Sequence, residues 1–302
     1  MLHARAFRVS VVWTLILLFL GSVVHATESS LACPDWPTCF GTLAPEMTGG
    51  VFWEHLHRLV AGGLLLMWGL ATWLAYREAD VPPWVFRTSL MGVGLLLVQS
   101  VFGGLTVIYR LPDLVSTTHL ALALAFLVLA TALASATSRP GRENGHHTGA
   151  GLRRWAIAAT VLVFVQSVLG ALVRHMDAGM ACPDAPLCLG QVVPPLVNAP
   201  ITVHFLHRVL GVVVAIAVSA FAYRLYTSAL AHRIRRWAPV AFALVVVQVG
   251  LGFASVLTVL AVAPVSLHTL VAASLLAVLT HIAVVTEPAQ RYEASRIPAR
   301  TV

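Results

Sequence analysis

Long apolar segments limit what this chain can fold into. Eight stretches of about 18 residues or more follow one another along the 302 residues with almost no charge inside them. A helix of about 20 apolar residues crosses about 30 Å of hydrocarbon, and it satisfies its own backbone hydrogen bonds there. The sequence therefore predicts an all-α integral membrane protein with eight transmembrane helices. The expected spans lie near residues 7–25, 52–75, 85–109, 113–137, 153–173, 201–226, 236–260 and 264–286.

Composition excludes the soluble alternative. Hydrophobic residues make up 59% of the chain and charged residues only 10%. A soluble domain of this length would have to leave much of this apolar surface in water. Strands are no alternative, because residues that span lipid as strands must close into a barrel and alternate in polarity.

The basic residues predict the orientation. All 19 are arginine, and the connections at residues 26–51, 110–112, 174–200 and 261–263 contain only Arg110 and Arg174. Because basic residues favour the cytoplasmic side, we expect both termini in the cytoplasm and the loops 26–51 and 174–200 outside a bacterial-type membrane. The net charge of +7 then reflects this topology, and it gives no reason to expect a nucleic-acid partner.

An internal repeat divides the chain. Residues 21–41 align without gaps on residues 170–190, and further matched pairs follow. We therefore expect an N-terminal four-helix half at 1–140, a cytoplasmic linker at 141–151 and a C-terminal half at 152–302, related by a pseudo-two-fold axis along the membrane normal. The first segment resembles a cleavable signal peptide, but its counterpart lies in mid-chain, which argues against cleavage. The matched pairs are His57-Arg58 with His207-Arg208, Gln99 with Gln248, and His119 with His268.

Four of these histidines lie within predicted spans. His57, His119, His207 and His268 are each expected about 9 Å below the outer surface, as two pairs on facing helices. Two imidazoles from opposite helices suit the axial positions of a haem iron inside a four-helix bundle. A closed zinc site is less consistent, since no further ligand is expected at that depth around the second pair. The simplest alternative is that the histidines only form hydrogen bonds between helices.

The two halves differ beside these histidines. Glu54 precedes His57 by three residues, whereas the corresponding position in the second half is His204. A carboxylate there can accept a proton, which places chemistry in the first half, although a glutamate near a helix N-terminus also favours the helix dipole. Arg58 and Arg208 are candidates to pair with haem propionates, or to extend to the membrane interface.

Four cysteines lie in the two outer loops. Cys33 and Cys39 form one pair in sequence, and Cys182 and Cys188 form the other. An oxidising exterior and the short spacing favour one disulfide within each loop among three connectivities. Such a disulfide either braces the loop or changes its redox state during turnover. Metal binding by the cysteine pairs is disfavoured, because neither loop has the two-residue spacing of zinc knuckles.

These features together resemble the haem A synthase family. The resemblance rests on Glu54-His-Leu-His-Arg58, the Cys-Pro-Asp-Trp-Pro-Thr-Cys loop with its second copy, and the histidines of the fourth and eighth spans. It implies a membrane oxidoreductase that converts a methyl group of haem O into the formyl group of haem A by successive hydroxylations. It further implies a resident haem b on His207 and His268, substrate haem on His57 and His119, and Glu54 as the catalytic carboxylate.

Departures and alternatives accompany this resemblance. His25 stands where the second half has Arg174. A bis-histidine b-type cytochrome that only passes electrons, or a haem carrier, would use the same ligands. The resemblance makes membrane lipid, haem O synthase and a terminal oxidase in assembly candidate partners; it leaves the electron acceptor and a homo-oligomer open. The remaining histidines we assign to interfacial or surface positions: His3, His55, His146, His147, His175, His232 and His281.

Overall fold

A computed structural model describes residues 1–79, 81–138 and 149–286. Eight of its helices are long and apolar enough to cross a membrane, which confirms the predicted all-α membrane class. The described residues contain no strands beyond two isolated bridges, Cys39 with Thr42 and Cys188 with Gln191. The helices are α1 (Leu2–Ala26), α2 (Gly49–Arg77), α3 (Pro83–Ile108), α4 (Asp113–Thr137), α5 (Gly149–His175), η1 (Ala178–Met180), α6 (Ala199–Tyr226), α7 (His232–Arg235), α8 (Trp237–Leu257) and α9 (Val262–Val285).

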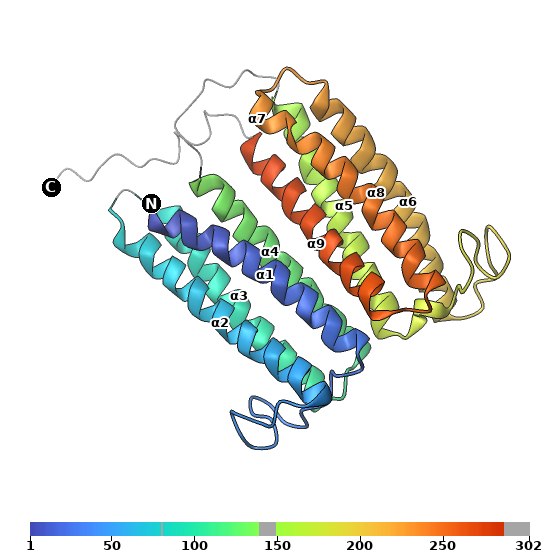
Figure 1. Cartoon of the computed structure of the whole chain (residues 1–302). Helices are drawn as coiled ribbons and strands as arrows, with labels where there is room; N and C mark the ends of the chain where they lie inside the picture. The colour runs from blue at the N-terminus through green and yellow to red at the C-terminus, as the bar shows by residue number, and fades with distance from the viewer. Residues whose placement is uncertain (80, 139–148, 287–302) are drawn as a thin grey trace.

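The helices form two bundles that lie side by side (Figure 1). In the first bundle, α1 packs on α2, α2 on α3, α3 on α4, and α4 on α1. The second bundle has the same order of contacts among α5, α6, α8 and α9. The bundles meet through α1 and α4 on one side and α5 and α9 on the other. These contacts correspond pair by pair, as the sequence repeat leads one to expect; the symmetry axis itself stays a prediction.

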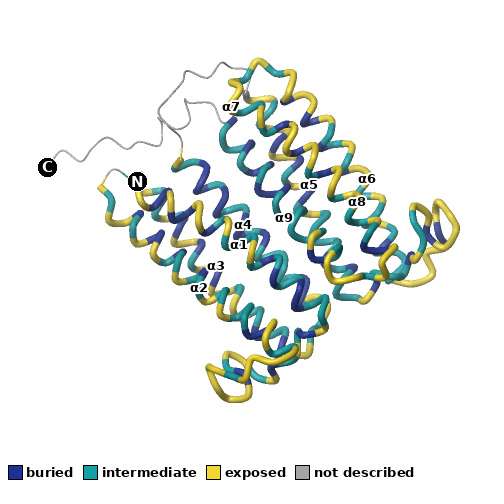
Figure 2. The backbone as a smooth tube through the Cα atoms, in the orientation of Figure 1, coloured by how far each residue is buried: buried dark blue, intermediate teal, exposed yellow. Residues whose placement is uncertain are grey.

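Large apolar side chains fill the interior of each bundle. Phe7, Trp68 and Phe126 pack together in the first bundle, and the indole nitrogen of Trp68 donates to the carbonyl of Ser89 at 2.8 Å. This bond removes the cost of burying the only polar atom of the indole. Exposed residues follow the outward faces of the helices (Figure 2). Many of the exposed residues are large and apolar, which is what a lipid-facing surface requires.

Helix ends differ slightly from the predicted spans. The span predicted to end at residue 260 ends at Leu257 in α8, because Val259 and Leu260 adopt φ values of 53° and 61°. Arg110 and Leu111 do the same after α3, with φ of 55° and 60°. Left-handed residues cannot continue a right-handed helix, so each pair forms a tight hairpin. These turns hold α3 against α4 and α8 against α9.

Two polar loops lie at one end of the bundles, and α7 and the N-terminus lie at the other (Figure 1). We call residues 27–48 the first cysteine loop and residues 176–198 the second. Most of the predicted linker at 141–151 lies outside the described residues, as do Arg291, Arg296 and Arg300 near the C-terminus.

Candidate functional site

The four predicted ligand histidines occupy matched positions. His57 lies eight residues into α2 and His207 eight residues into α6, whereas His119 and His268 lie six residues into α4 and α9. At about 1.5 Å per residue, these positions are about 12 Å and about 9 Å from the N-terminal ends of their helices. Each bundle thus has one such imidazole on its second helix and one on its fourth, at similar distances from the helix ends.

Each of these imidazoles packs on a glycine of the neighbouring helix. A methyl group added to that glycine would lie only 2.8 to 3.2 Å from the Cε1 atom of the ring. Because ordinary carbon contacts are about 3.5–4.0 Å, a larger residue would push the ring away. The glycines therefore let the rings sit between helices in both bundles. The pairs are Gly21 with His57, Gly103 with His119, Gly170 with His207, and Gly252 with His268.

Backbone carbonyls orient two of the rings. The Nδ1 atom of His119 lies 3.1 Å from the carbonyl oxygen of Gln99, and that of His268 lies 3.1 Å from the carbonyl oxygen of Gln248. A carbonyl only accepts hydrogen bonds, so Nδ1 carries the proton and Nε2 keeps its lone pair. This is the tautomer that a histidine needs in order to bind iron through Nε2.

The other two rings have different surroundings. The side-chain amide of Gln166 lies 3.1 Å from Nδ1 of His207 and donates to the His207 carbonyl at 2.9 Å. Nδ1 of His57 is buried and has no hydrogen-bond partner among the described residues. If the gapless alignment is extended by four residues toward the N-terminus, Leu17 corresponds to Gln166 of the second half. A buried nitrogen without a partner costs free energy, so it marks a place where a bound group would add a contact.

This donor set fits haem better than zinc. In the described part of the chain, none of the four histidines belongs to a group of three or more metal-binding side chains. Each bundle has two imidazoles, each packed on a glycine, and so offers two nitrogen ligands. Two axial nitrogens complete the coordination of a haem iron, whereas tetrahedral zinc needs more protein ligands.

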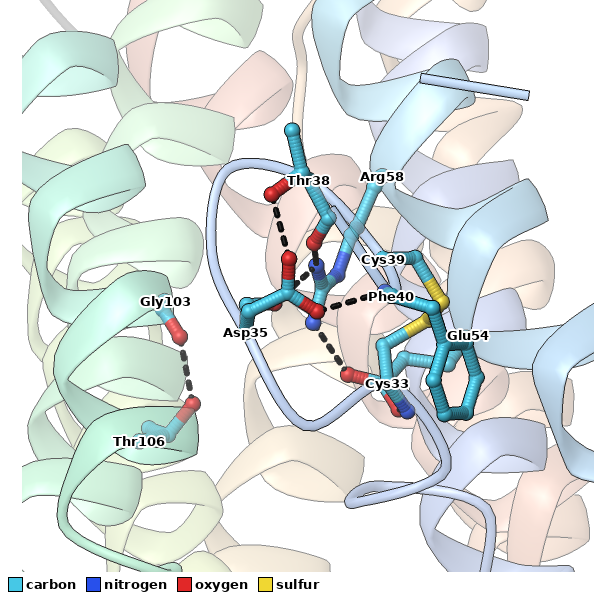
Figure 3. Close-up of polar contacts among 9 residues, drawn as sticks. All are labelled: Cys33, Asp35, Thr38, Cys39, Phe40, Glu54, Arg58, Gly103 and Thr106. Carbon is cyan, nitrogen blue, oxygen red and sulfur yellow. Dashed lines mark hydrogen bonds and ion pairs between the residues drawn. A yellow bond between two sulfur atoms is a disulfide. The ribbon is translucent and has the colours of Figure 1, made fainter. Parts of the chain in front are cut away.

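Glu54 faces the first cysteine loop. One carboxylate oxygen accepts the backbone N–H of Cys33 at 2.8 Å, and the other lies 2.6 Å from the guanidinium of Arg58, one helical turn later (Figure 3). Arg58 also donates to the carbonyls of Asp35 and Thr38 at 2.7 and 2.6 Å. Glu54 is only 4% exposed, so this ion pair is well shielded from solvent.

The second loop repeats this arrangement with a histidine in place of the carboxylate. Arg208 donates to the carbonyls of Cys182 and Asp184 at 2.6 and 2.7 Å, and its Nε donates to Nε2 of His204 at 3.1 Å. The Nδ1 atom of His204 lies 2.8 Å from the Ala178 carbonyl. Both candidate propionate-binding arginines thus direct their guanidinium groups at the loop backbone, and their pairing with propionates stays a prediction.

Disulfides close both loops, between Cys33 and Cys39 and between Cys182 and Cys188. The Asp35 carboxylate accepts hydrogen bonds from the Thr38 hydroxyl and from the backbone N–H of Phe40 (Figure 3). It also accepts the backbone N–H of Gly41, and these bonds lower the pKa of Asp35.

The second loop has an equivalent carboxylate. The backbone N–H groups of Gly190 and Leu189 donate to Asp184 and lower the pKa of that carboxyl in the same way. In both halves, a disulfide, an arginine and an aspartate therefore hold the loop over one end of its bundle.

Sequence reasoning misplaced some of the remaining histidines. His3 and His55, which we had expected at the surface or interface, are 2% and 5% exposed. His3 pairs with Glu78 at 2.8 Å, a contact between distant residues that no local pattern reveals. His146 and His147 lie outside the described residues.

A polar contact between the bundles was also missed. His25 stacks on His175 with 5.3 Å between ring centroids, and Arg174 donates to the His25 carbonyl at 3.0 Å. The available signal was the departure from the repeat, since His25 aligns with Arg174.

Comparison with known proteins agrees with this geometry. Residues 46–280 match the COX15-CtaA family, described as cytochrome oxidase assembly protein. A heme A synthase of Shouchella clausii is 31% identical over 81% of this chain and 83% of its own length. One of Symbiobacterium thermophilum is 30% identical over 92% of this chain and 93% of its own, and one of Alkalihalophilus pseudofirmus is 29% identical over 91% and 94%. With its paired histidines and duplicated loops, the chain belongs to the COX15-CtaA family of cytochrome oxidase assembly proteins.

Proposed function

We propose that this protein is a haem A synthase, a membrane oxidoreductase that converts a methyl group of haem O into the formyl group of haem A. The observation that carries the proposal is the pair of glycine-cradled histidines in each bundle, with a carboxylate beside only one pair. The relatives named heme A synthase, which align over most of the chain, support the same activity.

We assign different roles to the two bundles. His119 and His268 each have a glutamine amide beside Nε2, but only the second bundle has a further glutamine, Gln166, beside His207; this extra contact supports a permanently held haem b there. When bound, haem b supplies reversible one-electron transfer. His57 has no partner at Nδ1, and we assign it with His119 to the substrate haem O in the first bundle.

Glu54 is the residue proposed to handle protons. Its carboxylate is held by the Cys33 N–H and the Arg58 guanidinium, so it enters the reaction as a fixed, paired anion. Oxidation of a methyl group to an aldehyde with oxygen taken from water releases four electrons and four protons, and haem b in the second bundle would pass the electrons one at a time to an external electron acceptor. Glu54 accepts a proton from that water, while the cysteine loop above it covers the outer end of the bundle. The second bundle has His204 at this position and lacks this acceptor.

The orientation follows from the distribution of arginines. Both termini are assigned to the cytoplasm and both cysteine loops to the outside of the membrane. An external location also suits the two disulfides, since disulfides persist in oxidising compartments.

The test is to replace Glu54 by Gln in protein made in cells that supply haem O, and to analyse the extracted pigments by chromatography. Gln keeps an oxygen that can accept the Cys33 N–H but cannot act as the base, so haem A should disappear while haem b is retained. Glu46→Gln, an exposed carboxylate of the same loop, is the control and should keep haem A. Full conversion of haem O to haem A in Glu54→Gln would exclude Glu54 as the base. Haem b as the sole pigment of the wild-type protein would indicate an electron-transfer cytochrome.

A further inference from the structure

The first cysteine loop has a buried histidine beside its disulfide. A ring nitrogen of His55 and the sulfur atoms of Cys33 and Cys39 all lie within 4.8 Å of one another. All three residues are buried, with His55 5% exposed and both cysteines 0% exposed. The Nδ1 atom of His55 has no hydrogen-bond partner among the described residues. A buried ring nitrogen without a partner is destabilising unless a bound group supplies a contact. The two sulfur atoms nearby indicate that a metal ion is the group to consider.

The second cysteine loop lacks this histidine. The repeat places Phe205 at the position of His55, although the disulfide, the arginine and the aspartate are all present in both loops. His55 is therefore not needed to close or brace such a loop. Its role must belong to the first loop alone, and it is separate from that of the neighbouring Glu54, whose two oxygens are occupied by Cys33 and Arg58.

We propose that Cys33, Cys39 and His55 form a binding site for a single Cu(I) ion when the first disulfide is reduced. Thiolates and imidazole are the ligands that soft Cu(I) prefers. The described residues around this group add no fourth metal-binding side chain, which disfavours tetrahedral zinc and suits a three-coordinate ion. Because the three ligand atoms already lie together, binding requires only small movements of the loop.

The site exists only in the reduced loop, so its formation is a redox step. A dithiol reductant, such as a thiol–disulfide exchange protein, breaks the Cys33–Cys39 bond and becomes a disulfide itself, and the two cysteines gain the protons as thiols. Cu(I) then displaces those protons and binds the two thiolates and the neutral imidazole. In the reverse exchange, the two thiolates pass two electrons to the disulfide of the exchange protein, which becomes a dithiol by taking up two protons; the Cys33–Cys39 bond forms again and Cu(I) is released, so the loop holds copper only under reducing conditions.

The experiment uses the full-length protein in detergent, with Cys182→Ser and Cys188→Ser introduced so that only the first loop can provide thiolates. The protein is reduced with a phosphine under anaerobic conditions, and Cu(I) is offered as its bicinchoninate complex. We expect the reduced protein to remove one equivalent of Cu(I) and the oxidised protein to remove none. His55→Phe, which copies the residue of the second loop, should weaken binding at least tenfold. His232→Phe, at an exposed histidine, should leave it unchanged.

Several outcomes would overturn the proposal. Equal Cu(I) affinity in His55→Phe and the parent would exclude His55 as a ligand, and equal uptake by the oxidised protein would exclude the cysteines. Uptake that survives Cys33→Ser with Cys39→Ser would place the copper elsewhere. The visible spectrum of bound haem b shows in each variant that the bundles remain folded. None of these readouts depends on haem A formation, so the copper site and the proposed synthase activity can fail independently.

Discussion

Replacing Gly170 by alanine should weaken haem binding in the second bundle. The new methyl carbon would lie 2.8 Å from Cε1 of His207, whereas an ordinary carbon contact is about 3.5–4.0 Å. The ring must therefore retreat by about 0.7 Å or more. Without haem, the ring of His207 can move away from the new methyl group. A ring bound to iron is held in place, so the substitution destabilises the haem-bound state.

The size of the effect follows from overpacking. Inserting a methyl group into a packed core costs about 1–3 kcal/mol. Alanine also stabilises a helix over glycine by about 1 kcal/mol, but this gain is present with and without haem and cancels in the binding equilibrium. We therefore expect haem b to bind about 5- to 150-fold more weakly, since about 1.4 kcal/mol corresponds to a factor of ten.

The assay measures the haem-to-protein ratio after purification and the rate at which haem transfers to an excess of a haem-scavenging protein. Gly252→Ala, with a contact of 3.2 Å to His268, should have a smaller effect than Gly170→Ala. Gly250→Ala lies on the same helix as Gly252 and meets nothing within 4 Å, so it is the matched control. If Gly170→Ala kept haem as firmly as Gly250→Ala, the glycine would have no part in positioning the ligand.

Three further predictions concern the loops and the second bundle. Arg58→Gln leaves the buried Glu54 carboxylate without its charge partner, so it should lower the free energy of unfolding by about 3–5 kcal/mol. The expected signs are a lower melting temperature and faster proteolysis of the first cysteine loop. An unchanged melting temperature would contradict this. Gln166→Leu introduces the residue that the first half has at the equivalent position, and it removes a polar contact of His207. It should therefore shift the midpoint potential of haem b in a redox titration. An unchanged potential would refute the role of this contact. Hydrogen bonds lower the pKa of Asp35, so its ionised carboxylate stabilises the loop fully above the ordinary aspartate pKa, and this stabilisation is lost only as the pH falls through the lowered pKa. The loop should therefore still resist proteolysis at pH about 5. Asp35→Asn should be cleaved faster than the wild type at every pH where the carboxylate is ionised.

The sequence alone determined the class of the fold and the candidate ligands. Long apolar segments can satisfy their backbone groups in lipid only as helices, so the eight spans followed from local composition. The internal repeat then matched His57 with His207 and His119 with His268, which tied four scattered histidines to two equivalent positions. Helix periodicity and length were sufficient to place them at similar depths, because the rise per residue is constant.

Only the tertiary structure decided what each side chain contacts. Arg58 follows His57 in the sequence, yet its guanidinium contacts the first cysteine loop, because a long side chain reaches atoms that are 20 residues or more away along the chain. The glycines that cradle the histidines lie on other helices, and one-dimensional patterns do not reveal which helix packs against which. His55 illustrates the same limit: its burial beside a disulfide depends on how a loop folds back over a helix end, which local propensity does not specify.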